Sequence, residues 1–226
     1  MRILATDAAT RVPRQLILAM IAASGAAWLG LELDFDEPPA FDRRIRRLAR
    51  ARSLNAARTA LSTLYPIGLP GGFISIAYAS AHWLRKKRRR GGPAIVTAAW
   101  LGWLLHRAVK LGYHRERPLR PGVRRRTDSY PSGHTTGTTA LALTLAYVLR
   151  REGLMSFRRA AAIAIVPPAI MGAYRVIADD HWATDVIGGW LLGGTIALTC
   201  SAITGTESRS SRVRRHARQA RQLSTT

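Results

Sequence analysis

The chain has 226 residues, with 47% hydrophobic residues and a formal charge of +22. This length suits one domain and is short for two. The cations fall in separate short clusters between long uncharged stretches, which is typical of loops that flank membrane spans and argues against a nucleic-acid-binding protein. Cys200 is the single cysteine, which excludes an intramolecular disulfide.

Six apolar segments follow in chain order, each near the roughly 20 residues that cross the hydrocarbon core of a bilayer. They lie at about residues 15–33, 61–84, 93–113, 132–149, 160–177 and 186–204. Prolines and glycines near Pro70 predict a kinked or broken helix in the second segment, and Pro167 and Pro168 predict a bend in the fifth. We therefore expect an all-α bundle of six transmembrane helices. Because three of the segments are short, a soluble all-α protein remains an alternative.

The distribution of Lys and Arg predicts the orientation. Basic clusters follow the second, fourth and sixth segments, at residues 85–90, 150–159 and 209–221. Positive charge marks cytoplasmic loops, so these clusters and the N-terminus are expected in the cytoplasm. We expect a membrane domain over residues 1–206 and a disordered basic cytoplasmic tail over residues 207–226. The first segment also fits a signal peptide, because arginines precede an apolar run rich in small residues.

Residues 41–58 do not fit this charge rule, because they are arginine-rich yet would lie outside the cytoplasm. Phe41, Ile45 and Leu48 fall on one helical face between the arginines. This pattern predicts an amphipathic helix that lies against anionic head groups. A solvated basic loop is the alternative.

Three clusters of ionisable residues lie at the ends of the expected spans. They are Lys110 with Arg117, the run Ser132, Gly133 and His134, and the group Arg175, His181 and Asp185. The loop between spans three and four and the loop between spans five and six lie on the same side of a six-span bundle. We therefore expect all three clusters to meet at one membrane face, opposite the basic loops.

The third cluster has the spacing of a nucleophile and its orienting group. His181 and Asp185 are four residues apart, so on a helix Asp185 can accept a hydrogen bond from one imidazole nitrogen. The other nitrogen is then free to attack, as in a catalytic triad. Alone, however, this pair also fits a simple helix-end hydrogen bond.

The remaining residues suit a phosphoryl group. Lys110, Arg117 and Arg175 supply cations for its oxygens, and Arg does so with a forked donor. Ser132 is placed to cap the fourth helix while its hydroxyl and the Gly133 amide face an anion. His134 then remains as a general acid for the leaving oxygen.

These residues carry a resemblance to the type-2 phosphatidic acid phosphatase (PAP2) superfamily. Its motifs are Lys-x6-Arg-Pro, Pro-Ser-Gly-His and Ser-Arg-x5-His-x3-Asp, and here they read KLGYHRERP, PSGH and YRVIADDHWATD. Order, spacing and catalytic residues match, over residues 110–185. Tyr174 stands where the third motif has serine.

The resemblance implies the fold and a mechanism. The fold would be a six-helix bundle of the PAP2 / vanadium chloroperoxidase-like type. His181 would attack phosphorus with help from Asp185, His134 would protonate the leaving group, and water would hydrolyse the phosphohistidine. The phosphate ligands would be Lys110, Arg117, Ser132, Gly133 and Arg175, with no metal and no cofactor.

The resemblance also implies a substrate class and a location. The substrate would be a membrane lipid phosphate such as phosphatidic acid, phosphatidylglycerol phosphate, undecaprenyl pyrophosphate or lipid A phosphate. The enzyme would be a multi-pass protein of a bacterial inner membrane, with its site on the periplasmic face. The bilayer and this lipid are the expected partners. The sequence does not indicate an oligomeric state or name the lipid.

Alternatives remain at this stage. A lipid phosphotransferase would use the same site with an alcohol acceptor, and a basic membrane anchor would bind anionic partners through its tail. Asp179, Asp180, His181 and Asp185 could suggest a metal site, although nearby cations oppose it. Further arginines in the loop after the third span could grip a polyanionic head group or be solvated: Arg115, Arg120, Arg124, Arg125 and Arg126.

Overall fold

The computed structural model describes residues 13–33, 37–118 and 128–223, with side chains up to residue 204. Every regular element in these ranges is helical. The elements are α1 (Arg14–Glu32), α2 (Ala40–Ala49), the 3₁₀ turn η1 (Arg52–Leu54), α3 (Asn55–Ser62), α4 (Tyr65–Gly68), α5 (Pro70–Lys86), α6 (Gly92–Lys110), α7 (Gly133–Arg151), α8 (Phe157–Ile177) and α9 (Ala183–Leu223).

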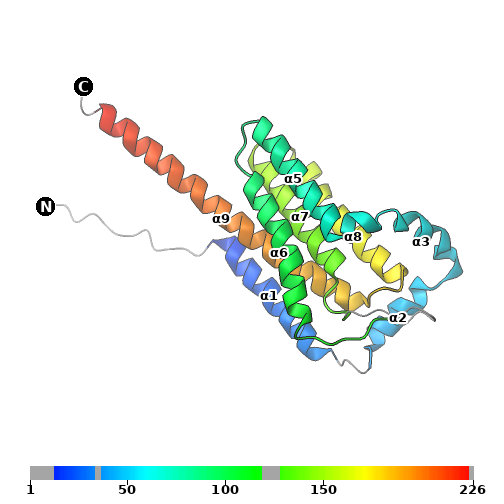
Figure 1. Cartoon of the computed structure of the whole chain (residues 1–226). Helices are drawn as coiled ribbons and strands as arrows, with labels where there is room; N and C mark the ends of the chain where they lie inside the picture. Colours follow the sequence, from blue (N-terminus) through cyan, green and yellow to red (C-terminus); the bar gives the residue numbers. More distant parts are fainter. Residues whose placement is uncertain (1–12, 34–36, 119–127, 224–226) are drawn as a thin grey trace.

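The long helices form a bundle with α7 at its centre. α7 packs against α6, α8 and α9, while α1 lies along α9 (Figure 1). Buried apolar side chains such as Phe73, Leu84, Ile95 and Val148 join α5, α6 and α7. Tyr130 donates a hydrogen bond to the carbonyl of Ala26 over 2.5 Å. These contacts make α1 part of the bundle.

Small residues bring α9 close to α7. A Cβ added at Gly193 would lie 2.6 Å from Cβ of Thr139 and 2.7 Å from the carbonyl oxygen of Thr136. Close approach through small residues is typical of helix pairs in membranes. The register of these two helices sets the site, because α7 begins beside His134 and α9 begins beside Asp185.

The second apolar segment is broken, as predicted. It is divided among α3, α4 and α5, and Pro70 begins α5. Gly68 ends α4 at a point where a side chain would collide with His134, because an added Cβ would lie 2.4 Å from its Cδ2. The break therefore carries a short helical turn past the site.

The all-helical class is confirmed, but the expectation of six spans is only partly met. Within the described ranges, three helical stretches are long and apolar enough to cross a membrane: Arg14–Glu32, Phe157–Ile177 and Ala183–Thr204. Helix α6 ends in His106, Arg107 and Lys110, and α7 begins with His134 and several threonines. Residues that serve a polar site thus lower the hydropathy of these helices.

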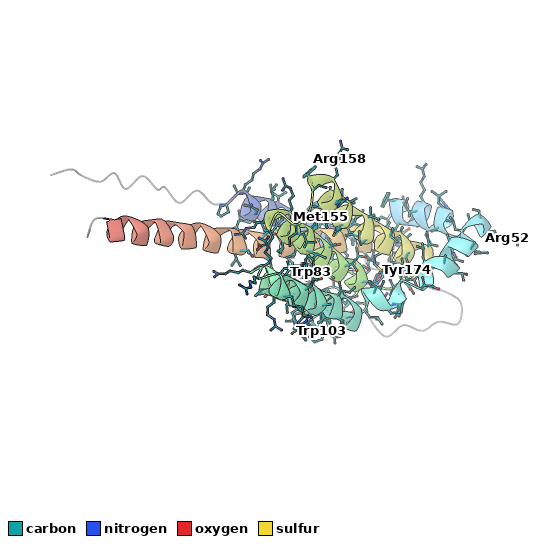
Figure 2. All side chains as sticks on the ribbon, turned by 90° about the horizontal axis from the view of Figure 1, so that it is seen from above. Arg52, Trp83, Trp103, Met155, Arg158 and Tyr174 are labelled. Carbon is teal, nitrogen blue, oxygen red and sulfur yellow. The ribbon has the colours of Figure 1, made fainter. Side chains whose placement is uncertain are left out.

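The two ends of the bundle differ in character. At one end Arg89 lies 3.6 Å from Glu152, and Arg151 donates to the carbonyl of Thr204 over 2.7 Å. These contacts gather the basic connections after α5 and α7 beside α9. Trp83 and Met155 lie toward this end and Arg52 lies toward the other (Figure 2). The connections α6–α7 and α8–α9, which carry the predicted site, meet at the end where α2 lies.

The two predictions for the basic segments had different outcomes. A helix does form in the segment 41–58, as α2, with Phe41 and Leu48 exposed. The disordered tail was wrong for residues 207–223, because α9 continues to Leu223. That stretch has no Gly or Pro and is rich in Arg, Gln and Ala, which favour helix.

Candidate active site

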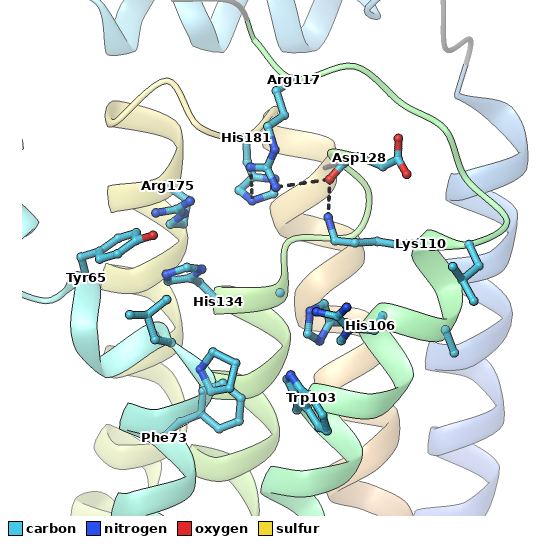
Figure 3. A pocket seen from close by; sticks show the side chains of 17 residues that line it. Tyr65, Phe73, Trp103, His106, Lys110, Arg117, Asp128, His134, Arg175 and His181 are labelled. Carbon is cyan, nitrogen blue, oxygen red and sulfur yellow. Dashed lines mark hydrogen bonds between the residues drawn. The ribbon is translucent and has the colours of Figure 1, made fainter. Parts of the chain in front are cut away.

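A cavity of about 730 Å³ lies where the three clusters meet (Figure 3). Its polar wall includes Lys110, Arg117, Gly133, His134, Arg175 and His181, and Asp128, His106, Arg107 and Tyr65 also line the cavity. Its other wall is largely apolar and includes Leu69, Phe73, Trp103 and Leu111. The site therefore has a cationic end beside an apolar end, as an amphipathic substrate requires.

The tautomer of His181 follows from its partners. Nη1 of Arg117 lies 3.0 Å from Nε2 of His181, and a guanidinium can only donate. Nε2 must therefore be the nitrogen without a proton, and Nδ1 carries the proton. Nδ1 faces Oδ2 of Asp185 at 3.4 Å. The bare nitrogen thus faces the cavity while Asp185 holds the opposite side of the ring.

Asp185 is itself held firmly. Its Oδ2 accepts hydrogen bonds from the backbone N–H of Trp182 at 2.8 Å and from the hydroxyl of Ser129. The Trp182 bond is one half of a capping box at the start of α9. Its Oδ1 accepts from Arg115 at 2.7 Å. The side chain is fully buried, so its position is defined by these donors.

Two of the predicted phosphate ligands converge on one backbone carbonyl. Lys110 and Arg117 both donate to the oxygen of Asp128, Arg117 over 3.2 Å. Arg117 also donates to the carbonyl of Asp180 over 2.8 Å. These contacts direct both cations to the rim beside His181 (Figure 3).

Arg175 completes the cationic wall from α8. It is buried, and its Nη1 lies 3.0 Å from Oδ2 of Asp180. The ring of Tyr65 lies 5.4 Å from its guanidinium carbon, and the ring of Tyr174 lies 5.7 Å from it. Tyr174, which stands where the family has serine, therefore packs on this arginine.

His134 lies at the start of α7 and lines the cavity beside Tyr65, with ring centroids 4.9 Å apart. Gly133 lies against His106, since an added Cβ would be 2.7 Å from the imidazole. The capping role expected of Ser132 was wrong. Among the described residues its side chain makes no cap hydrogen bond, and its hydroxyl instead accepts from Thr135 at 3.0 Å. Ser132 is buried behind the cavity wall rather than lining it.

Arg115 is not a head-group contact. It is 2% exposed and donates to Asp42 and Asp185, each over 2.7 Å. The loop arginines Arg120, Arg124, Arg125 and Arg126 lie outside the described residues. Sequence reasoning also missed Asp42, although this acid lies among arginines on the same face of α2 as Ile45 and Ala49.

The acids of the α8–α9 connection are engaged by arginines. Asp179 lies 2.8 Å from Arg46 and 2.6 Å from Arg50, so its carboxylate balances two arginines. Burial raises the pKa of Asp179, but the hydrogen bonds from Arg46 and Arg50 outweigh this effect and leave the pKa below its usual value. In the described ranges no group of three His, Cys, Asp or Glu side chains is arranged to hold a metal ion.

The surroundings of His181 also set its charge. Burial, followed by the nearby Arg117, Arg175 and Lys110, lowers the pKa of His181 well below its usual value. Each of these effects disfavours the imidazolium. The ring is therefore neutral near pH 7, which is the form that can act as a nucleophile.

The fold and the cavity define an all-helical membrane protein with a histidine in a cavity lined by cationic side chains. Comparison with known proteins agrees. The model of the PAP2 superfamily matches residues 94–209. The chain belongs to the PAP2 superfamily.

Curated relatives and a solved structure extend this result. The decaprenylphosphoryl-5-phosphoribose phosphatase of Mycobacterium tuberculosis is 29% identical over 147 residues, which cover 62% of this chain and 75% of that enzyme. The enzyme of the same name from Mycolicibacterium smegmatis is 31% identical over 123 residues, or 52% and 62% of the two chains. A transmembrane PAP2-type phosphatidylglycerolphosphate phosphatase from Bacillus subtilis has the same fold, with a TM-score of 0.65, 23% identity and coverage of 86% and 98%. The protein is thus a membrane lipid phosphatase of the PAP2 type.

Proposed function

We propose that this enzyme hydrolyses the phosphomonoester of a lipid-linked head group through a phosphohistidine on His181. The observation that carries the proposal is the bare Nε2 of His181, which faces a cationic cavity with Asp185 behind the ring. A neutral imidazole with an oriented partner is an activated nucleophile.

The first step forms a bond from Nε2 to phosphorus and breaks the ester P–O bond. Lys110, Arg117 and Arg175 neutralise the equatorial oxygens, where the transition state carries its charge. Phosphate oxygens offer better acceptors to Arg117 than the neutral imidazole does, so substrate binding draws the guanidinium from Nε2. His134 donates a proton to the departing oxygen.

The second step returns the enzyme to its starting form. Water attacks the phosphohistidine, the P–N bond breaks, and His134 takes the proton that water gives up. The products are inorganic phosphate and the dephosphorylated lipid. No residue in this sequence of steps changes its oxidation state.

The two walls of the cavity and the names of the relatives support a proposal for the substrate class. The cationic wall takes the phosphate, and Leu69, Phe73 and Trp103 offer apolar surface for the lipid. The curated relatives bear the name of a phosphatase for a decaprenylphosphoryl phosphoribose. We therefore rank this prenyl-linked sugar phosphate first, ahead of phosphatidylglycerol phosphate, phosphatidic acid, undecaprenyl pyrophosphate and lipid A. The site would lie on the periplasmic face of a bacterial inner membrane.

A phosphate-release screen of the purified protein tests the proposal. Each of the five lipids is presented in detergent micelles with a chelator present, and His181→Ala is the control. We expect release of inorganic phosphate by the wild type and none by the variant. Phosphate that appears on an added alcohol instead of in solution would identify a phosphotransferase, and turnover by His181→Ala would refute the nucleophile.

A further inference from the structure

The helix α2 reaches into the catalytic network. Its Asp42 is 1% exposed although it belongs to an arginine-rich surface helix. Its carboxylate is shielded from solvent and does not line the cavity. It contacts the residues that hold Asp185. Burial of a carboxylate costs free energy unless hydrogen-bond donors compensate for the lost water, so the partners of Asp42 indicate its role.

The first set of partners is the start of α9. Oδ1 of Asp42 accepts from the backbone N–H of Thr184 at 3.0 Å, and Oδ2 accepts from the Thr184 hydroxyl at 2.6 Å. The first N–H groups of a helix have no partner within the helix, and a carboxylate there is stabilising. Asp42 therefore caps, from another helix, the turn that carries Asp185.

The second partner is Arg115, which lies between two carboxylates. One guanidinium nitrogen donates to Asp42 at 2.7 Å and the other donates to Asp185 at 2.7 Å. All three side chains are buried, so their charges act on one another with little screening by water. The order of contacts is Asp42, Arg115, Asp185 and His181.

We propose that Asp42 and Arg115 are positioning residues of the phosphatase, which fix Asp185 and leave its negative charge available to His181. Asp42 offsets the charge of Arg115. Without this offset, the positive charge of Arg115 would cancel the negative charge of Asp185. Asp185 would then stabilise less well the positive charge that His181 gains when it is phosphorylated. The inference rests on the proposed role of His181 as the nucleophile.

The wider contacts of α2 agree with this role. Arg46 and Arg50 bind Asp179, and Arg58, which follows α2, donates to the carbonyl of Ile177 over 2.8 Å. The guanidinium of Arg46 also lies 5.1 Å from the ring of Trp182. The segment 41–58, which was expected to lie on head groups, thus also contacts and stabilises the α8–α9 connection that holds His181.

The test compares Asp42→Asn with Arg43→Ala. Asparagine has nearly the same shape, but it replaces one carboxylate oxygen with a donor that must face Thr184 or Arg115, which are themselves donors. Arg43 is the adjacent residue, and its contact with Glu37 is exposed, so this variant controls for changes to the surface of α2. The substrate is whichever of the five lipids the wild-type enzyme hydrolyses fastest.

The readout is the single-turnover rate constant for formation of the phosphoenzyme, together with KM. A rate constant does not depend on the fraction of protein that is folded, so a merely structural defect would lower the amplitude alone. We expect Asp42→Asn to lower the rate constant about 10- to 100-fold, the usual effect of losing a residue that orients a reacting group through another residue, with KM nearly unchanged. Arg43→Ala should match the wild type.

Two further variants, Asp42→Glu and His181→Ala, make the test decisive. If Asp42→Asn does not fold, Asp42→Glu replaces it, since it keeps the charge but displaces the carboxylate, and the same reduction is expected. A rate constant within about twofold of the wild type would overturn the inference. The variant His181→Ala is run alongside: if it stays active, the proposed nucleophile fails, whereas an inactive His181→Ala with a normal Asp42→Asn refutes the positioning role alone.

Discussion

Arg117 donates a hydrogen bond to Nε2 of His181 over 3.0 Å. This contact places the guanidinium that is proposed to bind phosphate directly at the nitrogen that is proposed to attack. The same arginine also donates to the carbonyl of Asp180 at 2.8 Å. Under the proposed mechanism, a phosphate that enters the cavity therefore meets a donor and a nucleophile that are already adjacent.

Removal of the Arg117 guanidinium should weaken the stabilisation of the transition state. We expect Arg117→Ala to lower kcat/KM about 10²- to 10³-fold, the usual effect of losing one donor to a developing oxyanion. Arg117→Lys should recover only part of this loss, because lysine keeps the charge but lacks the fork. Steady-state phosphate release with the preferred lipid measures both variants. An Arg117→Ala enzyme with normal kcat/KM would exclude Arg117 from the phosphate site.

The low pKa of His181 predicts behaviour in acid. Because burial and neighbouring cations lower this pKa, the neutral ring persists as the pH falls through 6.5 and gains its proton only well below that value. Imidazole resonances of the detergent-solubilised protein, assigned by their loss in His181→Gln, measure this directly. His181 should show no titration between pH 6 and pH 8, unlike an exposed histidine near 6.5. A midpoint at or above 6.5 would contradict the electrostatic account.

Gly68 should be essential for the position of His134. An alanine there would place its Cβ 2.4 Å from Cδ2 of His134 and displace the proposed general acid. We expect kcat to fall about 100-fold, since a displacement near 1 Å can have this effect. Gly71→Ala is the matched control, because a Cβ at Gly71 meets nothing within 4 Å. Equal kcat values for the two variants would count against this role of Gly68.

Gly193 and Gly194 should respond differently to the same substitution. A Cβ at Gly193 would lie 2.6 Å from Cβ of Thr139 and 2.7 Å from a backbone oxygen, whereas a Cβ at Gly194 meets nothing within 4 Å. Overpacking typically costs about 1–3 kcal/mol, so Gly193→Ala should lower the melting temperature in detergent. Gly194→Ala should be neutral or raise it, since alanine favours helix by about 1 kcal/mol. Two equal melting temperatures would argue against the close α7–α9 contact.

Local patterns in the sequence predicted that the three clusters of ionisable residues meet, and they do so at one cavity. Lys110, Arg117, His134, Arg175 and His181 line one cavity because the parity of the helices brings their connections to one end. The break near Pro70 was also foreseen, because proline limits where a helix can begin. Such features depend on short motifs and on helix order, both of which a single sequence displays.

The missed features depend on contacts between distant residues. Asp42 and Thr184 are 142 positions apart, and Arg115 and Asp185 are 70 apart. No periodicity links these residues, and the charge of Arg115 gave no sign that it would be buried rather than solvated. The hydroxyl of Ser132 was misjudged for a similar reason, because Thr135 offers it a donor that the capping rule does not consider.

The central claim is that His181 carries the phosphoryl group between the two steps. A substrate labelled in its phosphate, mixed rapidly with enzyme and quenched in base, should leave label on the wild-type chain. Peptide mapping should place the label on His181, acid should release it as expected for a P–N bond, and His181→Ala should take up none. Label that survives acid, maps to another residue or appears on His181→Ala would contradict the claim.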